Sequence, residues 1–120
     1  MKYLLMIYDN PTWDRLSETD AEAAVRGHFD FDRMVTESGE CVTSAGLADP
    51  AESTSVSVRG GEVVTTDGPF VESKELLAGF YLIDCESLDR AVELAALIPD
   101  ASSRAVEIRP VIDPFVGLEP

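Results

Sequence analysis

Apolar residues recur along the first part of the chain with two different spacings, and each spacing predicts a different element. Residues 2–8 place apolar side chains on both faces of a strand, which is typical of a central strand covered on both sides. Residues 9–11, Asp-Asn-Pro, break this pattern. Ser17 then predicts a helix N-cap, with Asp20 as the acidic member of a capping box.

The helix after this cap is expected to join the first strand to a second one. Between residues 21 and 35 the apolar positions, and His28 with them, recur every three or four residues, so His28 is expected on the buried stripe. Gly39 supplies the left-handed residue that commonly ends a helix. Residues 41–45 are then predicted to form the second strand.

The middle of the chain predicts a hairpin. A small polar loop over residues 48–53 precedes two strand-like segments, 55–58 and 63–66, which are separated by two glycines at 60 and 61. Residues 67–70, Asp-Gly-Pro-Phe, then predict a structured turn, because glycine and proline together impose turn geometry and remove an amide donor.

The second half repeats the strand–helix–strand order of the first. Residues 77–83 form a strongly apolar strand pattern, and Ser87 predicts the cap of a helix whose apolar stripe runs to Ile98. Pro99 is expected to end that helix. Residues 104–112 alternate as a last strand.

This order predicts a single α+β domain over residues 1–112, followed by a C-terminal tail at 113–120. Two similar β-α-β halves with an inserted hairpin suit a ferredoxin-like sheet with both helices on one face. Two helices cannot cover both faces of one sheet, yet two of the strands are apolar on both faces. We therefore expect a homodimer, in which two sheets pack into a dimeric α+β barrel.

The composition is that of a folded protein, and the charge limits its partners. Hydrophobic residues make up 45% of the chain and charged residues 27%, so disorder is not expected. The net charge of −14 repels nucleic acid and anionic membrane surfaces, and it equally serves solubility. Neither a signal peptide nor a membrane-spanning stretch is evident, which predicts a cytoplasmic location. Cys41 and Cys85 lack metal-site spacing and are expected to be buried thiols, with a disulfide as the alternative.

One long segment carries a family resemblance. Residues 64–83, which include Asp67-Gly68-Pro69-Phe70 and the following Glu-Ser-Lys-Glu, resemble the signature of the DGPF proteins within the YCII-related family. Residues 2–8, 46–47 and 106–111 extend the resemblance over nearly the whole chain. The resemblance implies a dimeric α+β barrel and a pocket built around a histidine of the first helix and an aspartate.

Known members of the wider family also suggest functions and partners. Some relatives are linked to the chemistry of ring-cleavage products or to dehalogenation. Members with the DGPF motif often accompany extracytoplasmic-function sigma factors. The resemblance therefore implies either a small-molecule enzyme or a regulatory module associated with a sigma factor, and it does not name the substrate.

His28 and Asp67 are the candidate catalytic residues. His28 is the only histidine, and a polar ring on a buried stripe needs a hydrogen-bond partner. A carboxylate such as Asp67 would orient the imidazole for general acid–base chemistry near neutral pH. The alternatives are that a backbone carbonyl satisfies His28 and that Asp67 only bonds the amides of its own turn.

Three further residues of the signature segment are candidates for substrate binding: Phe70, Glu72 and Lys74. The charged positions equally suit a solvated face. His28, Asp67 and Glu72 are chemically able to hold a divalent ion, but they lack recognisable ligand spacing, so no metal or other cofactor is predicted. No phosphate-binding glycine loop or serine-hydrolase motif occurs.

The sequence thus leaves two functions open. The first is an acid–base enzyme of the lyase, isomerase or hydrolase type, which acts on a small molecule through His28 and Asp67. The second is a ligand-binding or regulatory module without turnover. An open pocket at His28 would favour the first, and a sealed histidine the second.

Overall fold

The computed structural model of the chain describes residues 1–10, 15–69 and 75–114. The elements, with a short 3₁₀ helix at Pro50–Glu52 between the second and third strands, are in chain order β1 (Lys2–Asp9), α1 (Glu18–Glu37), β2 (Cys41–Gly46), β3 (Thr54–Arg59), β4 (Glu62–Asp67), β5 (Leu76–Asp84), α2 (Leu88–Ala96), α3 (Pro99–Ser103) and β6 (Val106–Pro110). The strands and the two long helices agree with the predicted pattern to within two residues at most of their ends.

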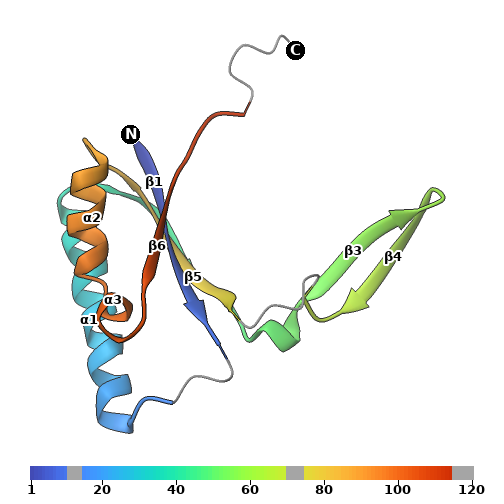
Figure 1. Ribbon diagram of the computed structural model, residues 1–120, viewed down its shortest axis with the longest axis horizontal. Coiled ribbons are helices and arrows are strands. Elements are labelled where there is room, and N and C mark those ends of the chain that lie inside the picture. Colours follow the sequence, from blue (N-terminus) through green and yellow to red (C-terminus); the bar gives the residue numbers. More distant parts are fainter. Residues whose placement is uncertain (11–14, 70–74, 115–120) are drawn as a thin grey trace.

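The main sheet has the strand order β2-β5-β1-β6, and each neighbouring pair is antiparallel. All three helices lie on one side of this sheet, and the β3–β4 hairpin projects from the other side (Figure 1). The protein therefore has a mixed α+β fold. Within it, β1 and β5 are the central strands, as their apolar sequences predict.

Local signals in the sequence set several element ends. The Ser17 side chain accepts a hydrogen bond from the Asp20 amide, and Ser87 does the same for Arg90, so both predicted N-caps are confirmed. Gly39 adopts a φ of 80° just after α1, as predicted for a left-handed end. The two glycines at the hairpin tip also have positive φ, 57° at Gly60 and 82° at Gly61.

One predicted helix boundary needs correction. Pro99 does not simply end the second helix: α2 stops at Ala96, and Pro99 begins the separate helix α3. Proline suits this first position because its missing amide hydrogen has no partner there in any case. The predicted turn at residues 67–70 lies only partly within the described residues: Asp67 ends β4, and Gly68 follows it with a φ of 97°.

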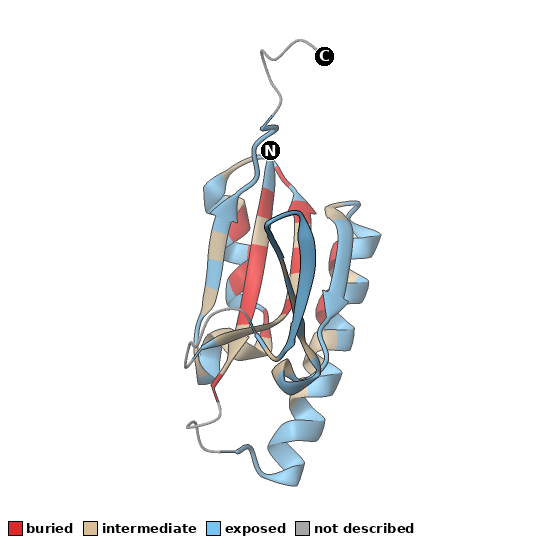
Figure 2. Ribbon diagram, turned by 90° about the vertical axis from the view of Figure 1, so that its right-hand side faces the viewer, coloured by how far each residue is buried: buried red, intermediate tan, exposed pale blue. Residues whose placement is uncertain are grey.

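The core lies between the helices and the inner face of the sheet. Leu5, Val35, Ile83 and Leu94 are fully buried there. Figure 2 shows that buried residues gather in the central strands and on the parts of the helices that face them. Cys85 belongs to this core, Cys41 is half-buried, and both are free thiols rather than a disulfide.

The outer face of the sheet is apolar too. Successive side chains of a strand point to opposite faces of the sheet. Leu5, Ile7, Tyr81 and Ile83 belong to the core on the inner face. The residues next to them therefore point to the outer face: Leu4, Met6, Phe80 and Leu82. No helix in the described part of the chain lies on that side (Figure 1). Within the same described ranges, no helix is both long enough and apolar enough to cross a membrane.

Two leucines of α2 test where the core lies. Leu94 is fully buried, whereas Leu88 is 51% exposed in the same helix. Leu94→Ala is expected to lower the free energy of unfolding by about 2–5 kcal/mol because it leaves a cavity in the core. Leu88→Ala, measured in the same urea titration, is expected to change it by less than about 1 kcal/mol. Equal losses in the two variants would contradict this core.

Candidate active site

His28 lies in the middle of α1, on the side that faces β5 and α3. Gly27, directly before it, lets α3 approach closely. A Cβ atom at Gly27 would lie 2.6 Å from Cγ of Pro99, which is too close for two carbon atoms. The glycine weakens the helix locally. In return, it allows the residue after Pro99 to reach the His28 ring.

Both ring nitrogens of His28 have protein partners. Nδ1 lies 2.8 Å from the hydroxyl oxygen of Tyr81 on β5. Nε2 lies 2.7 Å from Oδ1 of Asp100 on α3. The Tyr81 and His28 ring planes are 8° apart, but their centroids are separated by 6.0 Å. With the hydroxyl so near Nδ1, the two rings lie side by side rather than face to face.

The charges around these residues decide which atom holds each proton. Burial, with the negative charges of Asp32 and Asp100, raises the pKa of Tyr81 to about 12, so its hydroxyl stays protonated at neutral pH. The hydrogen bond from His28 lowers the pKa of Asp100, which is therefore a carboxylate. When the imidazole is neutral, the Tyr81 O–H donates to Nδ1, and Nε2–H donates to Asp100.

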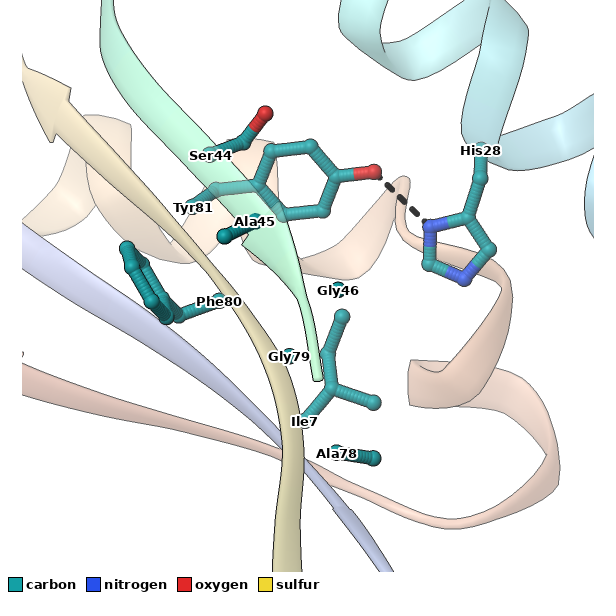
Figure 3. Close-up of a pocket in the computed structure, with 9 residues that line it drawn as sticks. All are labelled: Ile7, His28, Ser44, Ala45, Gly46, Ala78, Gly79, Phe80 and Tyr81. Atoms are coloured by element: carbon teal, nitrogen blue, oxygen red, sulfur yellow. Dashed lines mark hydrogen bonds between the residues drawn. The ribbon is translucent and has the colours of Figure 1, made fainter. Parts of the chain in front are cut away.

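A cavity of about 460 Å³ opens beside this chain of hydrogen bonds (Figure 3). Its wall is built from one residue of α1, one of β1 and neighbouring residues of β2 and β5, namely His28, Ile7, Ser44, Ala45, Gly46, Ala78, Gly79, Phe80 and Tyr81. Its volume lies within the range of small-molecule sites. The His28 side chain is 31% exposed, so it is neither sealed nor fully solvated.

Two glycines make room for this cavity. Gly79 pairs with Ile7 on one side and with Gly46 on the other, so all three positions share the inner face of the sheet. A Cβ at Gly79 would press to 3.0 Å from the carbonyl oxygen of Ala45, whereas one at Gly46 would meet nothing within 4 Å. Gly79 thus permits close approach of β2 and β5, and Gly46 leaves open space in the wall of the cavity.

Asp100 also faces a second cavity, of about 440 Å³, which lies between the start of α1 and α3. Asp20, Ser102 and Arg104 contribute polar groups to its wall. The chain Tyr81–His28–Asp100 therefore begins in one cavity and ends in another.

The structure separates the two predicted catalytic residues. His28 lies at the first cavity, whereas Asp67 ends β4 and is exposed in the hairpin sheet. The hairpin projects from the opposite side of the main sheet (Figure 1). Within one chain the carboxylate partner of His28 is Asp100, and a catalytic role of Asp67 stays a prediction. Phe70, Glu72 and Lys74 lie outside the described residues.

Tyr81 and Asp100 are the site residues that the sequence analysis missed. Tyr81 has the apolar flanks of an ordinary core-strand residue, and Asp100 follows a proline that was expected only to stop a helix. They are separated from His28 by 53 and 72 positions, so no local spacing connects them. The one available signal was the need of a buried histidine for partners.

These groups suit proton transfer. A neutral imidazole between a hydroxyl donor and a carboxylate is oriented in one tautomer and is stabilised when it becomes charged. Among the described residues, no group of three or more His, Cys, Asp or Glu side chains is arranged to hold a metal ion. The groups that the site brings together are an imidazole, a phenol and a carboxylate.

Comparison with known proteins places the chain in one family. The model of the YCII-related domain matches residues 1–115, which is almost the whole chain. A curated protein of Rhizobium meliloti (strain 1021), described as uncharacterized, is 34% identical over 114 residues, and the match covers 92% of each chain. These matches agree with the resemblance found in the sequence.

The hydrogen-bonded pair of His28 and Asp100 predicts a pH-dependent contribution to the free energy of unfolding. Asp100→Asn is expected to lower the free energy of unfolding at pH 7 by about 1–3 kcal/mol, since it removes a charged hydrogen-bond acceptor. Because folding lowers the pKa of Asp100, the unfolded chain takes up this proton first as the pH falls. The difference between wild type and variant should persist down to about pH 5 and shrink below about pH 4.

Urea unfolding at a series of pH values measures this difference. Asp30→Asn, at an exposed position of the same helix as His28, serves as the control and should show little loss. A deficit of Asp100→Asn that stays constant down to pH 3 would show that the carboxylate does not make this contribution.

Proposed function

The chain belongs to the YCII-related family, and from that premise we propose that it is a small-molecule acid–base enzyme in which His28 transfers the proton. The observation that carries the proposal is the hydrogen-bonded chain Tyr81–His28–Asp100 at the wall of a cavity. A histidine that served packing alone would not need a cavity beside it. The reaction class is a proton transfer of the lyase, isomerase or hydrolase type.

The roles follow from the proton positions. Tyr81 presents a protonated hydroxyl to an oxygen of the substrate and lies within reach of His28. When the substrate oxygen takes the hydrogen bond from Tyr81, the Nδ1 lone pair is released and can accept a proton from an acidic carbon or hydroxyl. Asp100 then stabilises the imidazolium through Nε2–H.

A second function has its own support. Because both His28 nitrogens already have protein partners, His28 also satisfies the description of a structural residue. In that case the cavity belongs to a ligand-binding or regulatory module without turnover. Association with a sigma factor would fit such a module, and a role of Asp67 in the hairpin would fit either function.

Proton exchange tests catalysis without requiring the natural substrate. A panel of small neutral ketones and ring hydroxy compounds is incubated with the protein in D₂O, and exchange of carbon-bound hydrogen is followed by NMR. Exchange of a true substrate class should be accelerated by wild type and reduced about 10²- to 10⁴-fold in His28→Gln. Tyr81→Phe should reduce it as well, whereas Asp30→Asn should not.

The outcomes separate the two functions. Exchange that is unchanged in His28→Gln would exclude His28 as the base. Binding of several compounds with no accelerated exchange of any of them would favour the non-catalytic module. Circular dichroism of each variant shows whether the fold is retained, so that a loss of exchange is not mistaken for unfolding.

We also propose that the chain is a ferredoxin-like homodimer, a dimeric α+β barrel. The order of the main strands and the helices on one side of the sheet support the ferredoxin-like part. The outer apolar face, which includes Phe80 and Leu82, supports the dimer. Val56, Val58 and Val63 of the hairpin are 64%, 64% and 69% exposed, and a two-stranded hairpin is marginally stable without cover.

Sedimentation velocity at micromolar concentration should show a dimer. Leu82→Asp places a charge on the outer face and is expected to give a folded monomer, whereas Leu88→Asp, on the exposed side of α2, should leave the dimer intact. Higher salt should favour the dimer, because each chain carries a net charge of −14. A wild-type monomer under these conditions would contradict the proposal.

A further inference from the structure

The cavity at His28 has an unusual charge balance for a site that handles metabolites. Among its nine described wall residues, none is lysine or arginine. Its polar side chains are the hydroxyls of Ser44 and Tyr81 and the imidazole of His28. Proteins commonly hold carboxylate or phosphate groups with arginine or lysine. This wall offers no such group for a negatively charged substrate.

Two carboxylates lie next to the cavity, whereas Arg104, which acts electrostatically on Asp100, lines the second cavity and not this one. Asp100 lies 2.7 Å from Nε2 of His28, and Asp32 is one helical turn beyond His28 on α1. Both carboxylates act electrostatically on Tyr81. Even when His28 is protonated, the His28–Asp100 pair is neutral as a whole, so it does not supply a free positive charge. An anion entering the cavity would meet repulsion that water does not screen fully.

The remaining wall favours an apolar ring with a hydroxyl or carbonyl group. Ile7 contributes an apolar side chain on the inner face, Ala45 and Phe80 border the cavity with side chains that point away from His28 (Figure 3), and Gly46 and Gly79 leave a wall without side chains. Ser44 lies directly opposite Tyr81 on the neighbouring strand. Two hydroxyls are thus available for one polar group of a ligand, while the glycines leave room for its ring.

We propose that this site selects uncharged ring compounds that carry a hydroxyl or carbonyl group, and that it excludes carboxylates and phosphates of the same size. The inference rests on the proposed function, since it names the substrate class of that same cavity. It goes further because proton transfer by His28 would be compatible with either charge. The discriminating feature is the acidic surroundings of a wall that lacks a cationic side chain.

Two matched ligands test the selection. 4-Hydroxybenzyl alcohol and 4-hydroxybenzoate share the phenol ring and nearly the same size, and at pH 7 they differ mainly in the negative charge. Binding is measured by calorimetry on the full chain, and the His28 ring signals in NMR report whether the ligand occupies this cavity. The alcohol is expected to bind about tenfold or more tightly than the benzoate.

A charge-introducing variant makes the test sharper. Ser44 is exposed on the edge strand β2 and lines the cavity, so Ser44→Lys adds a cation there with little disturbance of the core. This variant is expected to gain binding of 4-hydroxybenzoate by about tenfold relative to wild type. Ala21→Lys makes the same change in net charge in the first part of α1, away from the cavity wall, and should not gain it.

The outcomes are decisive for the substrate class. Equal or tighter binding of the benzoate by wild type, or binding of neither ligand, would overturn the proposal. An equal gain in Ala21→Lys would attribute the effect to total charge and would overturn it too. These results do not depend on turnover. Loss of the proposed enzyme function would appear instead as unchanged hydrogen exchange in His28→Gln, with the binding preference for neutral ligands retained.

Discussion

The site depends on the need of a half-buried imidazole for hydrogen-bond partners on both of its nitrogens. A polar ring on the inner stripe of α1 would cost free energy if either nitrogen were left unsatisfied away from water. Tyr81 and Asp100 meet that need from β5 and from α3, so one side chain connects three separate elements. Their positions then determine where the first cavity opens and which hydroxyl faces it.

Close packing is what makes those contacts reachable. The missing Cβ of Gly27 allows Pro99 to lie against α1, and the next residue is Asp100. A proline at the first position of α3 fixes the backbone there, so that the carboxylate is aimed rather than free to rotate with a loop. On the other side of the ring, Gly79 allows β2 and β5 to approach. Glycine at both places lowers the stability of its own helix or strand, but it allows the close contacts that form the site.

The sequence was informative where the physics is local. Ser17, Ser87 and the glycines at 60 and 61 act on backbone within a few residues, and their predicted caps and turn are confirmed. The inner position of His28 also followed from helical spacing. Its partners did not, because their contacts join residues 53 and 72 positions apart. Pro99 was misjudged for the same reason: a proline stops one helix and starts another equally well, and tertiary packing decides between them.

The acidic character of the chain and its uncovered apolar surfaces act in opposite directions. Two copies at −14 each repel, so an association through the outer face must overcome that repulsion by burying side chains such as Phe80 and Leu82. In the cavity, negative charge instead serves to discriminate between ligands. With no cationic side chain in the described wall, the carboxylates near His28 disfavour anions and leave an uncharged ring as the ligand that meets the least electrostatic cost. Charge therefore limits both what this surface can pair with and what this pocket can hold.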